Sequence, residues 1–214
     1  MNRRLRFAPL LVGLLCARPA LAYDAYNNFG PGDSYDATTG YAVTGGAYTP
    51  FTPFIQAGRF TAEASGMVAV IRMALHESFH PEADFNQVDV RLHNADASGN
   101  IGSIIAAFTR GGLTDFGLSD PPTTITSFDP AVTLTAGNQY WIVVAPGEGS
   151  TDAVWNWDAG AGGRRAFSTN SGLSYSYLDG RLGAMRIEVI PEPATLSVLF
   201  IGIAIVAFWN RHKR

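Results

Sequence analysis

Hydrophobic and polar residues alternate along several short segments of this chain. Residues 87–93 place Val88, Val90 and Leu92 on one side and polar residues on the other, which is the pattern of a half-buried β-strand. Residues 67–75 alternate more loosely, and residues 140–145 are apolar throughout, which predicts a strand buried on both faces. Further segments with strand character are residues 41–45, 54–60, 104–109, 125–134, 153–157, 165–168 and 185–190.

Turn-forming residues separate these segments. Of the 214 residues, 23 are Gly and 12 are Pro, and clusters such as Ser98–Asn100, Asp120–Pro122 and Ala136–Asn138 fall between the predicted strands. About ten short strands over residues 41–190 predict an all-β domain, specifically an antiparallel β-sandwich or jelly roll. Residues 23–40 are rich in Asn, Asp, Gly and Tyr, and we expect them to form a flexible N-terminal segment.

The N-terminus has the organisation of a secretory signal peptide. After three arginines near the start, residues 7–17 form an apolar run that is too short to span a bilayer. Ala20 and Ala22 supply the small-x-small pattern that signal peptidase requires. We therefore expect residues 1–22 to be removed by cleavage before Tyr23.

The C-terminus combines three features in a fixed order. Pro191, Glu192 and Pro193 are followed by an uncharged stretch, residues 194–209, and by a basic end, residues 210–214. As an α-helix the uncharged stretch spans roughly 24 Å, so a single transmembrane helix needs its flanking Trp and basic side chains at the membrane interfaces. The positive-inside rule keeps the basic end in the cytoplasm and places the preceding domain across the membrane.

This C-terminal region, residues 191–214, resembles the PEP-CTERM sorting signal of Gram-negative bacteria that make extracellular polysaccharide. The resemblance rests on Pro191-Glu192-Pro193, on Ala194-Thr195, and on the apolar stretch and basic end that follow. It implies transient anchoring in the inner membrane and cleavage near the tripeptide by an exosortase, a membrane-embedded cysteine protease-transpeptidase. It also implies delivery to the cell surface or extracellular matrix, so an exosortase and an exopolysaccharide are the expected partners.

Between the two terminal signals the chain is strongly acidic. Residues 23–193 contain eight Arg, no Lys and 18 Asp or Glu, a net charge of −10. Such a domain repels phosphate backbones, so nucleic acid is not an expected partner. The single cysteine, Cys16, lies inside the predicted signal peptide, so the mature chain offers no disulfide, thiolate nucleophile or cysteine metal ligand.

The central region, residues 41–188, resembles the choice-of-anchor R type of surface domain. The resemblance is carried by Ala42–Gly45, Gly58–Thr61, Val88–Leu92, Trp155 and the Leu-x-Ala-Gly-x-x-Tyr-Trp stretch Leu134–Trp141. It implies a β-sandwich that precedes an anchoring signal. It implies no catalytic residues.

The chain contains one H-E-x-x-H pentapeptide, His76-Glu77-Ser78-Phe79-His80. On a helix this spacing presents two imidazoles to zinc, with Glu as general base. The preceding residues alternate at a strand period, however, and Pro81 follows directly. In a strand, residues four apart lie about 13 Å from each other, too far for one metal ion. A zinc hydrolase is therefore the less favoured alternative.

Two groups of oxygen-rich side chains invite a comparison with calcium sites. Asn94–Asn100 begins like a calcium loop, but its twelfth position is Ile105 instead of the bidentate Glu that such a loop needs. A hairpin between the neighbouring predicted strands explains the same residues. Asp24, Asp33 and Asp36 form the second group, for which solvated surface charge is the simpler explanation.

Two pairs of aromatic residues, Trp155 with Trp157 and Tyr175 with Tyr177, are spaced to share a strand face. If exposed, such a pair can stack on sugar rings, although aromatic residues at this spacing more often belong to a core. Trp155 and Trp157, which have polar neighbours, are the candidate glycan-binding residues.

No Ser/His/Asp arrangement and no pair of carboxylates can be recognised in the predicted domain. We therefore predict a secreted, exosortase-processed surface or matrix protein whose β-domain is structural or adhesive, with no enzymatic activity and no metal or cofactor. A carbohydrate-binding module is the alternative function.

Overall fold

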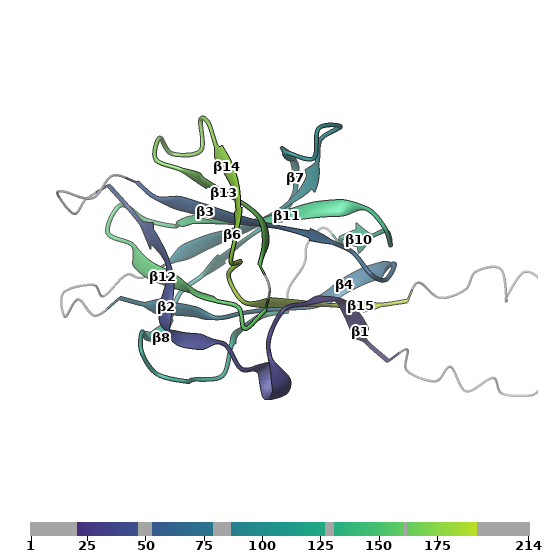
Figure 1. Cartoon of the computed structure of the whole chain (residues 1–214), viewed down its shortest axis with the longest axis horizontal. Coiled ribbons are helices and arrows are strands. Elements are labelled where there is room, and N and C mark those ends of the chain that lie inside the picture. Colours follow the sequence, from purple (N-terminus) through teal and green to yellow (C-terminus); the bar gives the residue numbers. More distant parts are fainter. Residues whose placement is uncertain (1–20, 47–52, 79–86, 127–130, 161, 192–214) are drawn as a thin grey trace, which may run out of the picture.

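The computed structural model describes residues 21–46, 53–78, 87–126, 131–160 and 162–191 (Figure 1). Within these ranges the only helical element is a 3-10 turn at Pro31–Asp33. The strands are β1 (Tyr23–Asn27), β2 (Asp36–Thr44), β3 (Ile55–Thr61), β4 (Gly66–Met73), β5 (Leu75–Glu77), β6 (Val88–Ala95), β7 (Ile101–Arg110), β8 (Thr114–Asp115), β9 (Thr123–Ile125), β10 (Thr133–Leu134), β11 (Gln139–Pro146), β12 (Asp152–Trp157), β13 (Gly163–Ser168), β14 (Ser176–Gly180) and β15 (Met185–Ile190).

The strands form three hydrogen-bonded sheets. The first has the order β1-β15-β4-β10, with β9 beside β4, and the second has six strands in the order β14-β13-β3-β11-β6-β7. The third has the order β2-β12-β5-β8. Every pairing is antiparallel except the short one between β5 and β8. The predicted all-β, antiparallel fold is thus confirmed for the described part of the chain.

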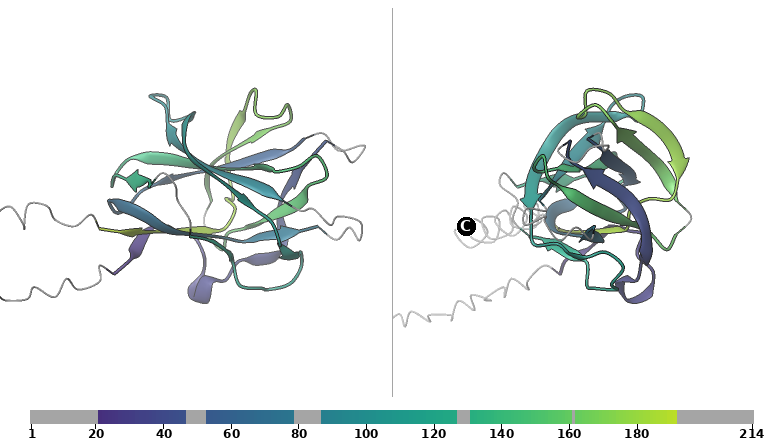
Figure 2. Two further views of the ribbon diagram at one scale, coloured as in Figure 1. Left: turned by 180° about the vertical axis from the view of Figure 1, so that it is seen from behind. Right: turned by 90° about the vertical axis from the view of Figure 1, so that its left-hand side faces the viewer.

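All three sheets contribute side chains to one main core, around which the strands wrap (Figure 2). Val88, Val90 and Leu92 of β6 are fully buried, whereas the side chains between them are half-buried, which confirms the predicted period of two. Trp155 from β12 and Ile187 from β15 lie in the same core. Burying an aliphatic side chain of this kind contributes about 1.5–3 kcal/mol, so this core is the main source of stability.

A second, smaller apolar cluster lies on the other face of the six-stranded sheet. Its buried members are Ile55, Ala57, Trp141, Val143, Ala145 and Ala166. Tyr175 and Tyr177, from the segment around β14, pack against it. With one cluster on each side, residues 140–145 of β11 are buried at every position, as their uninterrupted apolar sequence predicts.

Residues 23–40 are part of the fold instead of a flexible segment. β1 pairs with β15, with Tyr23 opposite Val189, and β2 begins at Asp36 and pairs with β12. Of the five residues of β1, Ala25 alone is fully buried, so the strand shows no alternation of its own. Its partner strand and tertiary packing determine its conformation.

Other strand predictions also need correction. Residues 67–75 do not form one strand, because β4 ends at Met73 and β5 begins at Leu75 in a different sheet. Residues 125–134 do not form one strand, because Ile125 ends β9 and Leu134 ends β10. β14 was not expected. It lies at the edge of its sheet, and half-exposed and exposed residues make up its sequence. Short or edge strands bury too few side chains to leave a periodic pattern.

The described chain begins and ends at one end of the domain, and the loops after β2 and β11 lie at the other (Figures 1 and 2). At the first end, called here the tail end, Tyr23 pairs with Val189 and β15 ends at Ile190. At the second, called the loop end, backbone hydrogen bonds join Gly45 to Thr151 and Gly147 to Gln87.

Candidate functional site

The two predicted processing points flank neighbouring strands at the tail end. Ala22 and Tyr23 are exposed at the start of β1, so a protease can reach this bond. The Tyr23 hydroxyl donates a hydrogen bond to the Ser65 carbonyl at 2.8 Å, which ties down the first residue of the expected mature chain. Pro191 directly follows the last residue of β15, so no spacer separates the fold from the Pro-Glu-Pro tripeptide.

The remaining sorting residues, Ala20, Glu192 and Pro193, lie outside the described residues. The same holds for residues 194–209, which the sequence predicts to be a transmembrane helix. Among the residues that the structure does describe, no helix is long and apolar enough to cross a membrane.

Arg186 holds the N-terminal segment to the last strand. Its Nε lies 2.6 Å from Asp24 Oδ1 and 3.2 Å from Glu188 Oε1, and its Nη1 lies 3.3 Å from Asp33 Oδ1. The hydrogen bond that Arg186 donates to Asp24, reinforced by the negative charges of the neighbouring carboxylates, raises the pKa of Arg186. Glu188 also pairs with Arg72. Asp24 and Asp33, two of the three aspartates in the second oxygen-rich group, are therefore ion-pair partners of Arg186.

Trp155 is a core residue and presents no surface to a glycan. Its side chain is 1% exposed and its Nε1 donates a hydrogen bond to the Ala184 carbonyl at 3.1 Å. The backbone of Gly183 lies against its ring, where a Cβ atom would come within 2.1 Å of ring carbons. A shift of register between Asn156 and Trp157 interrupts the alternation, which is why the two tryptophans have different environments.

Trp157 is half-buried, and side chains of the same chain already contact its ring. The ring centroids of Trp157 and Tyr41 lie 5.5 Å apart, and the Arg181 guanidinium lies 5.2 Å from the Trp157 ring. Arg165 in turn lies 3.9 Å from the Tyr41 ring. Each such cation–π contact contributes about 0.5–1 kcal/mol at a partly exposed site. A sugar that stacks on the ring face covered by Arg181 would have to displace this arginine.

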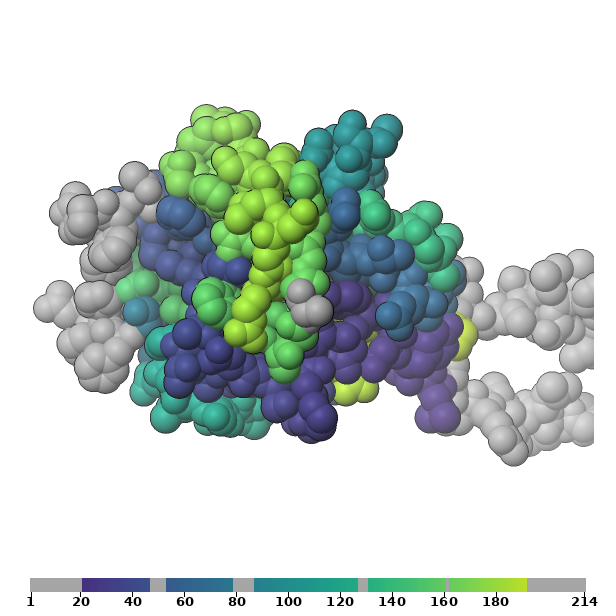
Figure 3. All heavy atoms as spheres, viewed as in Figure 1, coloured from purple at the N-terminus to yellow at the C-terminus, as the bar shows by residue number. Residues whose placement is uncertain are grey.

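Asp36, the third aspartate of the oxygen-rich group, pairs with a different arginine, Arg181. The segment that follows β14, drawn in yellow-green, crosses the front face of the domain and carries this arginine (Figure 3). Arg181 Nη1 lies 3.5 Å from Asp36 Oδ2, and its Nε lies 3.8 Å from Asp158 Oδ1. Burial raises the pKa of Asp158, and the positive charge of Arg181 partly offsets this effect. Asp36 is thus separate from Asp24 and Asp33.

His76 lies in strand β5, as the alternation predicts, and not on a helix. It is 1% exposed, and its Nδ1 lies 2.8 Å from Asn156 Oδ1. The Asn156 amide nitrogen donates to the Asp36 carbonyl, so its oxygen accepts, and Nδ1 of His76 must carry the proton. Nε2 of His76 lies 3.0 Å from the Tyr35 hydroxyl. Burial lowers the pKa of His76, which favours the neutral ring.

Both ring nitrogens of His76 therefore have hydrogen-bond partners within the protein, which disfavours a role for this residue as a metal ligand. Phe79 and His80, the rest of the pentapeptide, lie outside the described residues. In the described part of the chain, no group of three or more His, Cys, Asp or Glu residues is arranged to hold a metal ion.

The segment Asn94–Asn100 forms the turn of the β6–β7 hairpin, as predicted. Asp96 Oδ1 accepts hydrogen bonds from the backbone N–H groups of Ser98 and Asn100 at 2.8 and 2.9 Å. Such side-chain caps are typical of tight turns, and this one accounts for the polar residues of the segment without a bound ion.

In comparison with known proteins, the chain matches no family model and no curated protein. The resemblances to a sorting signal and to a surface domain therefore remain predictions from sequence motifs. In the structure, the first and last strands are neighbours at the tail end, where both predicted signals adjoin the domain, and the loop end is separate from them.

Proposed function

We propose that this chain is an exported, non-enzymatic protein of the cell surface or the extracellular polysaccharide matrix, sorted through its C-terminus. Its three sheets form a β-sandwich of the jelly-roll type, preceded by a cleaved signal peptide and followed by one transmembrane sorting helix. The proposal includes recognition by an exosortase at Pro191, Glu192 and Pro193.

The pairing of Tyr23 with Val189 is the observation that carries the proposal. It brings the end of the predicted signal peptide and the start of the predicted sorting signal to one end of the domain. Cleavage before Tyr23 and beyond Ile190 leaves both paired strands complete. Processing at both points would therefore release a folded domain.

A structural or adhesive role is the form of this function that the described residues support best. The carbohydrate-binding alternative finds no stacking platform at Trp155 and Trp157, because one is in the core and the other is packed against Tyr41 and Arg181. The zinc hydrolase alternative is supported least, since both nitrogens of His76 have protein partners.

Fractionation of the producing bacterium tests the proposal. The native chain is compared with a variant in which Pro191, Glu192 and Pro193 are all replaced by Ala, and with a Glu148→Ala control at the loop end. We expect the native chain and the control on the surface or in the matrix, and the triple variant in the inner membrane. A triple variant that reaches the surface as efficiently as the native chain would contradict the proposal.

A further inference from the structure

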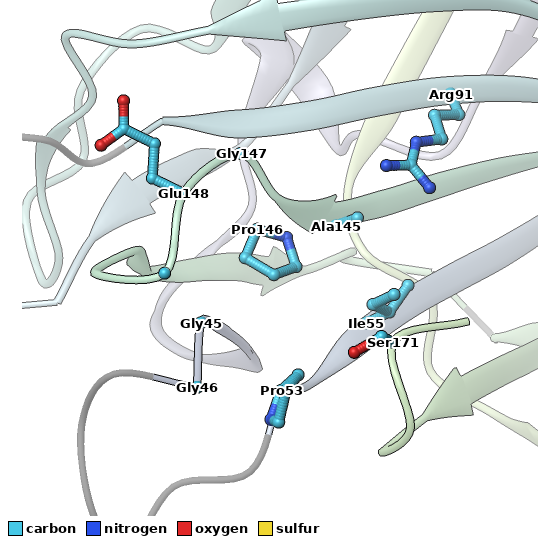
Figure 4. Close-up of a pocket in the computed structure, with 11 residues that line it drawn as sticks. Gly45, Gly46, Pro53, Ile55, Arg91, Ala145, Pro146, Gly147, Glu148 and Ser171 are labelled. Carbon is cyan, nitrogen blue, oxygen red and sulfur yellow. The ribbon is translucent and has the colours of Figure 1, made fainter. Parts of the chain in front are cut away.

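A hollow of about 310 Å³ opens at the loop end, beside the outer face of the six-stranded sheet (Figure 4). Ile55, Ala145 and Arg91 come from adjacent strands of that sheet and line one side. Pro146, the last residue of β11, also lines it. The other lining residues belong to three connections far apart in the sequence, and they are Gly45, Gly46, Pro53, Gly147, Glu148, Gly149 and Ser171.

Arg91 is the one charged side chain that points into this hollow. In Figure 4 its guanidinium is directed toward Ala145, whereas the carboxylate of Glu148 points away from the other lining residues. Asp89 Oδ2 lies 3.2 Å from Arg91 Nη2, and the other oxygen of Asp89 accepts a hydrogen bond from the Thr109 hydroxyl at 2.8 Å. The ion pair orients the guanidinium and neutralises its charge, and it occupies only some of its five N–H donors.

Two of the three connections that border the hollow, those after β11 and after β13, are fixed by buried hydroxyl groups. Thr151 is fully buried, and its hydroxyl donates to the Gln87 carbonyl at 2.6 Å and accepts the Glu148 N–H at 3.1 Å. On the other side, the Ser168 hydroxyl accepts the Gly172 N–H at 2.9 Å. Loops that are already ordered lose little conformational entropy when a ligand binds.

Ser171, at the border of the hollow, has a φ of 59°, in the left-handed region that non-glycine residues seldom adopt. In Figure 4 its hydroxyl faces the hollow. No hydrogen bond is assigned to that hydroxyl among the described residues. It is a second polar group available to a ligand, and it can donate or accept.

The lining indicates the chemistry of the ligand. Its many glycines leave backbone exposed and provide no deep apolar pocket for a peptide side chain. Its polar groups are the Arg91–Asp89 ion pair, which carries no net charge, and the Ser171 hydroxyl. The domain has a net charge of −10, so it repels a polyanionic ligand. The volume is at the small end of the roughly 300–1,000 Å³ of ligand sites.

We propose that this hollow binds a neutral saccharide unit, with Arg91 and Ser171 as hydrogen-bonding partners of its hydroxyl groups. The inference rests on the proposed function for its biological setting, because the hollow lies at the end opposite the anchored tail and would face the matrix. The binding chemistry itself depends only on the folded domain.

Calorimetric titration of the purified full-length chain in detergent tests this inference. The probes are a neutral glucan oligosaccharide, a neutral galactan oligosaccharide and an oligouronate. We expect at least one neutral probe to bind, the oligouronate to bind more weakly, and Arg91→Gln to weaken neutral binding at least about tenfold, or 1.4 kcal/mol. Arg110→Ala removes a positive charge from an exposed site outside the hollow and should leave binding unchanged.

A second pair of variants separates loss of the site from loss of the fold. Ser171→Phe should fill the hollow and abolish binding. Ser171→Gly, which adopts the positive φ without strain but lacks the hydroxyl, should weaken neutral binding without lowering the melting temperature. The inference is overturned if no neutral probe binds, if only the oligouronate binds, or if Arg91→Gln and Ser171→Phe bind as the native chain does. Because no export step is involved, such a failure leaves the sorting proposal intact.

Discussion

Tyr23 and Val189 face each other across the antiparallel pair of β1 and β15. The first residue of the expected mature chain thus lies beside the strand that leads into the predicted sorting signal. Since these strands are separated by nearly the whole domain in sequence, their pairing closes the longest loop in the fold. The first sheet therefore needs both β1, at the start of the domain, and β15, at its end.

Replacing Arg186 by Ala should loosen this closure. The variant loses the contacts to Asp24, Asp33 and Glu188, whose side chains are 34%, 30% and 12% exposed. Exposed pairs contribute up to about 1 kcal/mol and buried ones more, so we expect a loss of about 1–2 kcal/mol in the free energy of unfolding. Urea titration measures this loss, and hydrogen exchange should show it first in β1 and β15.

The matched control for this variant is Arg110→Ala. Arg110 is exposed, so its removal should change the free energy of unfolding by less than about 0.5 kcal/mol. Equal effects of the two variants would show that Arg186 contributes only its charge.

Trp155→Ala should destabilise the domain by about 3–5 kcal/mol, because it leaves a cavity in the main core and removes one of the two hydrogen bonds that the Ala184 carbonyl accepts. Gly183→Ala should also destabilise, since the new Cβ collides with the Trp155 ring. Thermal unfolding followed by near-UV circular dichroism measures both effects. A Trp155→Ala variant that melts within a degree or two of the native chain would refute the assignment of Trp155 to the core.

Acidification should weaken the fold through its buried histidines. Burial lowers the pKa of both His76 and His93, so below the unfolded-state pKa of about 6.5 the unfolded chain binds protons that the folded chain does not. Stability is therefore complete above this pH and falls as the pH drops toward the folded-state pKa, by at most about 1.4 kcal/mol per pH unit for each histidine. Asp158 has the opposite effect, because burial raises its pKa. Above its unfolded-state pKa of 3.8 the folded chain retains a proton that the unfolded chain loses, so this contribution to stability falls as the pH rises.

Melting temperatures between about pH 7.5 and pH 5 check this expectation. They should fall with the pH in the native chain and fall less in His76→Gln. A melting temperature that stays constant or rises over this interval would show that the two histidines do not control the acid response.

The pentapeptide at residues 76–80 should bind no catalytic zinc. The purified chain should contain well under one equivalent of zinc after exposure to the metal, because the ring nitrogens of His76 are hydrogen-bonded to Asn156 and Tyr35. Glu77→Gln should leave peptidase activity at the background level of the native chain. Stoichiometric zinc that is lost in His76→Ala would overturn this assignment.

The sequence predicts those strands that alternate or are wholly apolar. β6 and β11 have such patterns: in β6 the buried positions 88, 90 and 92 are apolar, and in β11 every residue from 140 to 145 is both apolar and buried. β1 could not be recognised, since its partner strand lies at the other end of the chain and Ala25 is its only fully buried residue. Pattern analysis detects local periodicity, and β1 owes its conformation to a distant segment.

Contacts between segments that are distant in sequence also determine the site features that the sequence does not reveal. Trp155 and Trp157 do not share a strand face as expected, because the register shifts between Asn156 and Trp157. The residue types at these positions do not predict such a shift. No sequence pattern distinguishes Arg186 and Arg181 from the other arginines, although in a domain with eight arginines and 18 acidic residues each arginine is a candidate ion-pair centre. The hollow at the loop end is assembled from segments far apart in sequence, so no motif marks it.

The proposed export of the chain and its processing at both ends are best tested by the intact mass of the protein released from the bacterial surface. We expect a chain that begins at Tyr23 and lacks the apolar stretch 194–209 and the basic end. Recovery of surface protein that still begins at Met1 or still ends at Arg214 would contradict it.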